Sequence, residues 1–154
     1  MVVSGSVLVE TDFLFGLSKR DRLHSAVMKV LELHRKGRVR IRVSSAAPLE
    51  AALVLLSRGF DPSVVTRALR LMEEMLDEYR VSGYEPLTLA VVRDAVRLRS
   101  VHGQLTLFDA LHMALSSQAE MPLLTADKTV RRVMEREGLP ALDYGDLGAG
   151  REGM

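Results

Sequence analysis

The sequence contains no cysteine and no tryptophan, and only three tyrosines and four phenylalanines among its 154 residues. The absence of cysteine excludes a disulfide framework, a zinc–cysteine finger and thiol catalysis, and it suits a reducing compartment. The scarcity of aromatic side chains leaves few candidates for base stacking, on which sequence-specific recognition of single strands usually depends. We therefore expect any contact with nucleic acid to be made through shape and backbone.

Long apolar runs and an excess of charge of one sign are also missing. No apolar run reaches about 18 residues, so we expect no membrane-spanning segment, and residues 1–10 lack the features of a signal peptide. Lysine and arginine number 21 against 20 aspartates and glutamates, a formal net charge of +1 at pH 7. That balance excludes a histone-like protein held by bulk charge and leaves room for a local basic groove. These observations together predict a cytoplasmic location.

Short β-branched or apolar runs alternate with longer helical patterns along the chain. The expected strands are residues 6–10, 39–43, 84–86, 122–125 and 140–143, and the expected helices are 13–17, 21–36, 44–56, 61–81, 89–101, 106–118 and 127–137. Asp21 and Asp61 are predicted to cap two of these helices, and Gly37 and Gly59 to stop two. Strands separated by helices imply right-handed crossovers, and hence a mainly parallel sheet with helices on both faces.

The domain organisation expected from the length is simple. The chain suits a single α/β domain over residues 1–144, without an internal repeat or a low-complexity linker. Residues 145–154 are small and polar, and we expect them to form a flexible C-terminal tail.

Several acidic residues lie near the ends of the predicted strands. Glu10 and Asp12 follow the first strand, and Glu50 lies in the helix after the second. Asp109 lies in the helix before the strand 122–125, and Asp127 follows that strand. Because ligands of an open parallel sheet bind beyond the carboxyl ends of its strands, these side chains have reason to gather on one edge. Glu50 and Asp109 lie in segments so apolar that we expect both to be buried and to need a cationic partner.

Each of these carboxylates also has a purely structural interpretation. Asp109 lies three residues after Thr106, close to the spacing of a capping box. Asp12 and Asp127 are placed to cap the helices that follow them, and Glu50 could pair with an arginine. The competing interpretation is that these residues share a divalent-metal site, and the residues alone leave the choice open.

Four segments, in this order and spacing, resemble the PIN-domain ribonucleases, which include the toxins of VapBC-type toxin–antitoxin pairs: VLVETDFLFGL, SSAAPLEAALVLL, LTLFDALHMALSSQAEMPLLT and TADKTVRRV. The most specific stretch is FDALHMALSSQAEMPLLTADK, because it joins an Asp-Ala helix to an apolar strand and a Thr-x-Asp turn at a fixed distance. The resemblance covers about residues 6–143. It implies a four- or five-stranded parallel sheet with helices on both faces and an acidic pocket that binds Mg²⁺ or Mn²⁺ and cuts RNA.

The resemblance also implies which residues form the site. Glu50, Asp109 and Asp127 match three acidic residues of the family, and Thr125 matches the hydroxyl residue beside the last acid. The first position departs from the family pattern, because Glu10-Thr11-Asp12 stands where Asp-Thr-Asn or Asp-Thr-Asp is usual. The expected catalytic and metal-binding residues are Glu10, Asp12, Glu50, Asp109 and Asp127, with Thr11, Ser45 and Thr125 in support.

Glu10 is one methylene longer than the aspartate it replaces. Either Glu10 reaches the metal in a wider pocket, or Asp12 takes over part of the metal binding. Asp12 can do so because residues two apart in an extended chain point to the same face. Alternatively the site has drifted and binds metal poorly, since Mg²⁺ demands near-ideal octahedral geometry.

By this resemblance the protein is a metal-dependent endoribonuclease, with RNA as substrate and an antitoxin protein as partner. Such a site needs no nucleophilic side chain, which agrees with the lack of a thiol, a Gly-x-Ser-x-Gly elbow, a P-loop and a dinucleotide-binding glycine pattern. One alternative is a module of the same fold with a degraded site that binds RNA or protein. Another is a metal-dependent phosphatase, which Glu10-Thr11-Asp12 fits badly because that class needs a nucleophilic first aspartate.

Arginines supply the candidate contacts to RNA, namely Arg38 and Arg40 in one basic stretch and Arg131 and Arg132 in another. The alternative for each stretch is a solvated surface. His112 shares a helix with Asp109, and we interpret it as a satisfied core histidine rather than a metal ligand.

The helix 61–81 has a broad apolar face for a chain of this size, made of Val64, Val65, Ala68, Leu69, Leu71, Met72, Met75 and Leu76. Part of that face is expected to stay uncovered in a monomer, which predicts a homodimer across a two-fold axis.

Overall fold

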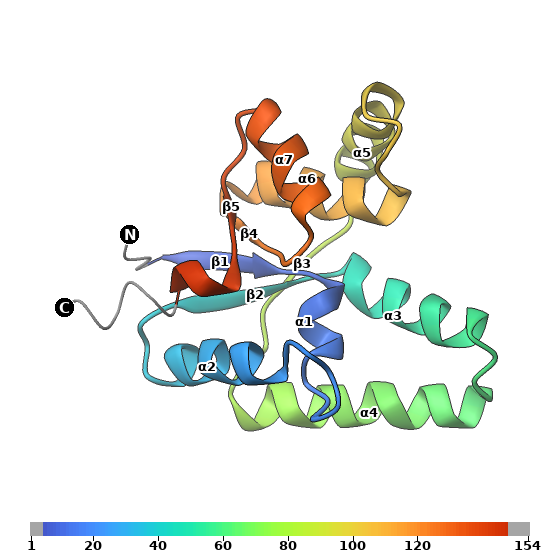
Figure 1. The fold of residues 1–154 in the computed structure, drawn as a ribbon, viewed down its shortest axis with the longest axis vertical. Coiled ribbons are helices and arrows are strands. Elements are labelled where there is room, and N and C mark those ends of the chain that lie inside the picture. The colour runs from blue at the N-terminus through green and yellow to red at the C-terminus, as the bar shows by residue number, and fades with distance from the viewer. Residues whose placement is uncertain (1–4, 148–154) are drawn as a thin grey trace.

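The computed structural model describes residues 5–147. Five strands form one sheet in the order β3-β2-β1-β4-β5 (Figure 1). They are β1 (Ser6–Val9), β2 (Arg40–Ser44), β3 (Tyr84–Glu85), β4 (Leu123–Leu124) and β5 (Ala141–Leu142). Every neighbouring pair is parallel. The predicted single α/β domain with a parallel sheet is therefore confirmed.

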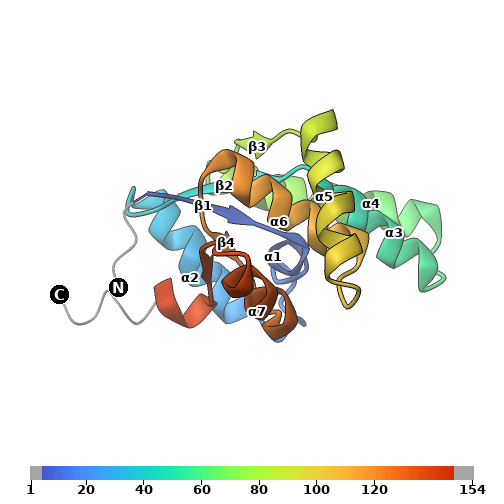
Figure 2. The same ribbon diagram turned by 90° about the horizontal axis from the view of Figure 1, so that it is seen from above.

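Helices cover both faces of this sheet. They are α1 (Thr11–Phe15), α2 (His24–Arg35), α3 (Ala46–Ser57), α4 (Pro62–Glu78), α5 (Leu89–Val101), α6 (Leu107–Ala119) and α7 (Lys128–Arg136). Helices α1, α2 and α4 lie on one side and α5, α6 and α7 on the other, while α3 extends outward from the sheet (Figures 1 and 2). Within residues 5–147, no helix is both long and apolar enough to cross a bilayer.

The core has two layers because side chains of the central strand alternate between faces. Val7 and Val9 pack with the α1, α2 and α4 side, whereas Leu8 packs with α5, α6 and α7. All three side chains are fully buried. Residues 7–9 of β1 are thus a continuous apolar run, as expected for a strand covered on both faces.

Local signals account for most helix ends. Asp61 is the N-cap of α4, with its carboxylate accepting a hydrogen bond from Ser63 N at 3.0 Å and Pro62 in the first turn. Gly37 and Gly59 follow α2 and α3 with φ of 75° and 89°, a region that favours glycine. These predicted caps and stops are confirmed.

Most predicted boundaries lie within two residues of those in the structure, and two differ by three residues. Asp21 does not cap the second helix, which begins at His24; its carboxylate instead accepts from Leu23 N at 2.9 Å in the turn before that helix. Helix α4 ends at Glu78 and not at 81, because Arg80 takes φ of 63° and Val81 N turns back to Leu76 O at 2.8 Å. That hydrogen bond closes the helix and leaves Val81 buried.

The C-terminal prediction is only partly covered. Residues 144–147 are helical, and the remainder of the tail predicted over 145–154 lies outside the described residues.

The strand order indicates where on this sheet a ligand would bind. From β1 the chain builds outward through β2 to β3 and then returns to the other side of β1 with β4 and β5. Open parallel sheets bind their ligands at the carboxyl ends of the strands where the order switches, and here that position lies between β1 and β4. Residues 10–12 and 125–127 follow the ends of these two strands, so both segments lie at the switch point.

Candidate functional site

Glu10 begins at the end of β1 and serves as the N-cap of α1, accepting a hydrogen bond from Asp12 N at 3.3 Å. The Thr125 hydroxyl, at the end of β4, donates to Glu10 Oε2 at 2.5 Å. Glu10 is only 8% exposed. Burial, followed by repulsion from Asp12, raises its pKa from 4.5 to about 7, although attraction to His112 and the Thr125 hydrogen bond act in the opposite direction. Glu10 is therefore a buried acid that ionises with difficulty in the metal-free protein.

Asp12 does not cap a helix, because Glu10 already holds that position. Its Oδ2 accepts from Ala126 N at 2.8 Å and its Oδ1 from the Tyr144 hydroxyl at 2.8 Å. Burial raises the pKa of Asp12, and the two hydrogen bonds partly oppose that rise. Asp12 thus ties the turn after β1 to the turn after β4 and to the helical residues after β5.

Tyr144 was not among the residues singled out in the sequence. It is buried, and its pKa is raised well above 10 by burial and by the nearby Asp12 carboxylate. The signal that identifies it is its position directly after the strand predicted over 140–143, since it obeys the same strand-end rule as the acidic residues.

Glu50, on α3, is half-buried and meets His112 on α6 rather than a lysine or an arginine. His112 Nε2 lies 2.9 Å from Glu50 Oε1, and the Thr11 hydroxyl donates to the same oxygen at 2.5 Å. Burial acts to raise the pKa of Glu50, but these hydrogen bonds outweigh it and the pKa is lowered. Burial alone would lower the pKa of His112, whereas its hydrogen bond to Glu50 and the surrounding carboxylates raise it.

Asp109 and Asp127 make the capping hydrogen bonds that their positions in the sequence suggest. Asp109 Oδ2 accepts from Thr106 N at 3.0 Å and the Thr106 hydroxyl accepts from Asp109 N at 3.0 Å, a capping box at the start of α6. Asp127 Oδ1 caps α7 by accepting from Thr129 N and Val130 N at 2.8 and 3.1 Å. Burial, then repulsion from Asp127 and Glu50, raises the pKa of Asp109. The capping role and membership of an acidic cluster are therefore compatible.

Electrostatic repulsion links the five carboxylates into one group. Repulsion from Asp12 raises the pKa of Glu10, and repulsion from Asp127 raises that of Asp12. The pKa of Asp109 is raised by repulsion from both Asp127 and Glu50. Four of the five lie at helix starts, where the helix dipole stabilises negative charge: Glu10 and Asp12 on α1, Asp109 on α6 and Asp127 on α7. The structure therefore brings acidic residues from four separate segments of the chain to one edge of the sheet.

This group fits a hard divalent cation. Glu10 and Glu50 each place a carboxylate oxygen, and His112 a ring nitrogen, within 4.8 Å of one another. Glu50 Oε2, Asp109 Oδ1 and Asp127 Oδ2 have no hydrogen-bond partner within residues 5–147. Among the same residues, none of the five carboxylates pairs with a lysine or an arginine, so the expectation that Glu50 and Asp109 are buried beside a cationic side chain is wrong: both are half-buried, and Glu50 contacts a histidine. Free oxygens beside buried, uncompensated acids are the donor set that Mg²⁺ or Mn²⁺ would take.

The expected supporting residues are only partly brought to the site. Thr11 and Thr125 donate to Glu50 and Glu10 as described above. Ser45 is the N-cap residue of α3 but makes no side-chain capping bond. Its neighbour Ser44 reaches His112 instead, with Ser44 Oγ 2.8 Å from Nδ1.

The candidate RNA contacts separate into two groups. Arg131 donates to Thr125 O at 3.0 Å and pairs with Asp143 at 3.3 Å, which places it beside the acidic edge. Arg132 is the next residue of α7 and is exposed. Arg40 is the first residue of β2, and Arg38 precedes that strand. Ser44, at the carboxyl end of β2, is about 13 Å from Arg40 along the strand, so both arginines lie at the end of the sheet opposite the acidic residues.

Comparison with known proteins identifies the family. The PIN domain model matches residues 7–135. The chain therefore belongs to the PIN domain family, which confirms the resemblance seen in the sequence. A search of curated protein sequences finds no significant match.

Solved structures of similar fold include VapBC-type proteins. VapBC2 from Rickettsia felis, bound to a DNA fragment from their promoter, aligns over 90% of this chain and 98% of that chain with 15% identity and a TM-score of 0.65. VapC20 from Mycobacterium tuberculosis, a toxin that cleaves the sarcin–ricin loop, aligns over 82% and 93% with 17% identity and a TM-score of 0.62. VapBC-1 from nontypeable Haemophilus influenzae aligns over 90% and 98% with 12% identity and a TM-score of 0.63. Identities this low show a shared fold, so activity must be argued from the site.

Proposed function

We propose that this protein is a metal-dependent endoribonuclease that hydrolyses RNA phosphodiester bonds at its acidic edge and acts as the toxin of a toxin–antitoxin pair. The observation that carries the proposal is the gathering of carboxylates, among them buried Glu10 and half-buried Glu50, at the carboxyl ends of the central strands of a PIN domain. The VapC-type toxins among its structural neighbours support the same class of activity.

The ligands of the cation come from Glu10, Asp12, Glu50, Asp109 and Asp127. Asp12 contributes least to direct binding, because both of its oxygens already accept hydrogen bonds. When bound, a divalent cation supplies Lewis acidity for activating water and neutralises charge that develops on the phosphate. The protein's part is to hold the carboxylates in place, through Thr125 for Glu10 and through helix starts for Asp109 and Asp127.

Mn²⁺ is the preferred metal for a first assay, with Mg²⁺ second. Glu10 carries one methylene more than the aspartate usual at its position, and Mg²⁺ tolerates a displaced oxygen poorly. Arg131 and Arg132, on the helix that Asp127 begins, are the proposed contacts to the RNA backbone. Arg38 and Arg40 could only contact a part of the RNA remote from the scissile bond, given their distance from the acidic edge.

The test is cleavage of single-stranded RNA by the purified protein in Mn²⁺, with a chelator as the negative control. Asp109→Asn should abolish cleavage, whereas Asp77→Asn, the same change at an exposed position of α4, should not alter it. Glu10→Asp should retain or raise activity because it restores the usual residue. RNA left intact by the natural protein but cut by Glu10→Asp would instead support the alternative of a binding module with a degraded site.

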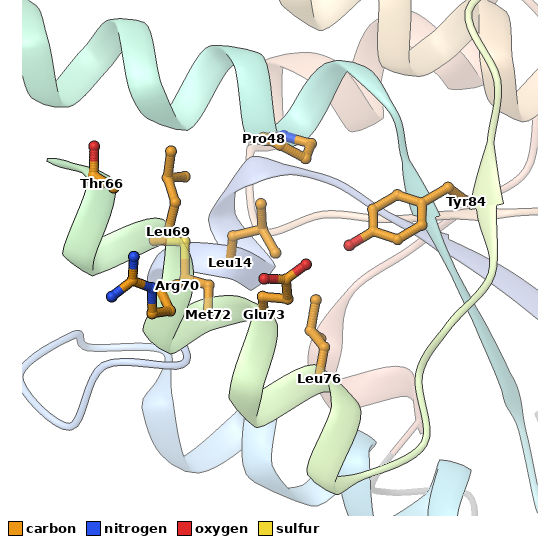
Figure 3. A pocket seen from close by; sticks show the side chains of 9 residues that line it. All are labelled: Leu14, Pro48, Thr66, Leu69, Arg70, Met72, Glu73, Leu76 and Tyr84. Carbon is orange, nitrogen blue, oxygen red and sulfur yellow. The ribbon is translucent and has the colours of Figure 1, made fainter.

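The proposed protein partner is an antitoxin that covers the apolar surface of α3 and α4. Leu53, Leu56 and Leu71 on these helices are 48%, 44% and 56% exposed. A hollow of about 370 Å³ lies between α1, α3, α4 and β3 (Figure 3), lined by Leu14, Pro48, Thr66, Leu69, Arg70, Met72, Glu73, Leu76 and Tyr84. A second of about 530 Å³ lies between α1, α3 and α4, with Glu74 and Glu78 among its lining residues. An amphipathic segment with basic flanks would suit both the apolar floor and the acidic margin.

The homodimer and the cytoplasmic location belong to the same proposal. On α4, Val64 and Leu71 remain exposed while Val65 and Leu76 are buried, so part of the apolar face identified in the sequence is uncovered. Self-association through this face and docking of an antitoxin would compete for the same surface, which makes the mass of the protein with and without its partner the informative measurement.

A further inference from the structure

His112 contacts Glu50 near the carboxyl ends of the central strands. The histidine lies on α6 and is 1% exposed, while Glu50 lies on α3. His112 Nε2 is 2.9 Å from Glu50 Oε1, and Thr11 Oγ1 is 2.5 Å from that oxygen and 3.3 Å from Nε2. Two elements separated in the chain therefore act on one oxygen of one carboxylate.

The donors and acceptors around the His112 ring require a hydrogen on Nε2. A carboxylate only accepts, so the Thr11 hydroxyl and His112 Nε2–H both donate to Glu50. On the other side of the ring, Ser44 Oγ lies 2.8 Å from Nδ1 and accepts from Ala46 N at 3.3 Å, which leaves the Ser44 hydroxyl hydrogen free to donate to Nδ1. A neutral ring with its hydrogen on Nε2 satisfies every group in this network, and that nitrogen then has no lone pair for a metal ion.

The same network leaves half of the carboxylate available. Glu50 Oε1 receives two hydrogen bonds, whereas Oε2 has no hydrogen-bond partner within residues 5–147. Glu50 is a side chain with three rotatable bonds that is partly exposed, with 20% of its side-chain surface accessible. Without the two donors it would have to be ordered when a cation binds, and that ordering reduces affinity.

We propose that His112 is a positioning residue that fixes Glu50 through Nε2–H, so that the other oxygen of Glu50 binds the divalent cation while the imidazole itself does not. The inference rests on the proposed function, because it assigns a role at the same metal site. Donors that orient a ligating carboxylate in this way typically change metal affinity about 10–100-fold when removed.

Two amide variants distinguish the contact of His112 Nε2 with Glu50 from the contact of Nδ1 with Ser44. The side-chain amide of His112→Gln reaches the position of Nε2 and can still donate to Glu50, whereas that of His112→Asn reaches only the position of Nδ1 and can bond Ser44 alone. Both replace a buried imidazole by a buried amide, so each serves as the packing control for the other. Melting of the metal-free variants measures any loss of folding separately from metal binding.

Calorimetric titration with Mn²⁺ should show affinity about 10–100-fold weaker for His112→Asn and within a few-fold of the natural protein for His112→Gln. Equal affinity in all three proteins, or equal loss in both variants, would overturn the positioning role while leaving the nuclease proposal standing. Absence of Mn²⁺ binding by the natural protein would overturn both, so the two failures are distinguishable.

A second measurement needs no variant. Pulsed electron paramagnetic resonance of Mn²⁺ bound to the natural protein, with and without ¹⁵N-labelled histidine, reports whether an imidazole nitrogen is coordinated. We expect spectra without a coupling from directly bound histidine nitrogen. Such a coupling would show that His112 is a ligand and would overturn the inference.

Discussion

Replacing Glu10 with glutamine should change how the stability of the metal-free protein depends on pH. The pKa of Glu10 is raised from 4.5 to about 7, chiefly by burial and then by repulsion from Asp12. The folded protein therefore binds the Glu10 proton more tightly than the unfolded chain does. Stability contributed by the neutral acid is present below about pH 4.5 and is lost as the pH rises through about 7.

The size of the effect follows from the difference between the two pKa values. The pKa of Glu10 in the folded protein is about 2.5 units above its value in the unfolded chain. Once Glu10 is ionised in both the folded and the unfolded protein, this difference lowers the free energy of unfolding by on the order of 3 kcal/mol. Glu10→Gln keeps a side chain of the same shape that does not ionise. The variant should thus be more stable than the natural protein by less than about 1 kcal/mol near pH 5 and by up to about 3 kcal/mol near pH 8.5.

Other groups at the site also titrate. The pKa values of Asp12, Asp109 and His112 are raised and that of Glu50 is lowered. These groups are present in both proteins, so the difference between the two unfolding free energies at each pH isolates Glu10, apart from its interactions with Asp12 and His112.

The assay is urea unfolding of both proteins in chelator, at several pH values from about 5 to about 8.5. Glu135→Gln, which removes an exposed carboxylate on α7, serves as the control for the loss of one charge. A stability difference between Glu10→Gln and the natural protein that stays constant over this range would refute the argument, because it would mean that Glu10 ionises as easily in the folded protein as in the unfolded chain.

Three further predictions concern stability and assembly. Asp109→Asn retains an oxygen for Thr106 N and relieves repulsion, so it should change the free energy of unfolding of the metal-free protein by less than about 0.5 kcal/mol, whereas Asp109→Ala loses the capping bond and should cost about 1 kcal/mol in thermal or urea unfolding. Tyr144→Phe removes the hydroxyl that donates to buried Asp12 and should destabilise the protein by about 1–3 kcal/mol; an unchanged melting temperature would show that this contact contributes nothing. Light scattering at micromolar concentration should give the mass of a dimer, and Leu71→Glu on the exposed face of α4 should reduce it to that of a monomer; a monomeric natural protein contradicts the predicted homodimer.

The fold could be predicted from the sequence because its elements are marked locally. Asp61-Pro62 begins one helix, and Gly37 and Gly59 end two others, at the positions the structure shows. Errors arose where a local signal has two structural meanings. Asp21 carries the signal of a helix cap but closes a turn, since the side-chain bond to the amide two residues on is common to both.

The acidic site also contains residues whose local sequence signal has two meanings. Asp109 and Asp127 look like caps in the sequence, and they are caps, but a helix that starts at the end of a strand also delivers its cap to the edge where ligands bind. The contact of Glu50 with His112 spans 62 positions and that of Asp12 with Tyr144 spans 132. Such pairs depend on how α3, α6 and the last described residues pack, which no local pattern contains.

The position of β1 in the middle of the sheet has a consequence for biosynthesis. The central strand is made first, and its neighbour β2 follows early, whereas β4 begins at Leu123. A chain still attached to the ribosome therefore carries Glu10 without Thr125, 115 positions later, and Asp12 without Tyr144. The acidic edge is complete only after nearly the whole domain has emerged, so a protein proposed to cut RNA has no assembled site while the earlier elements of this domain are being translated.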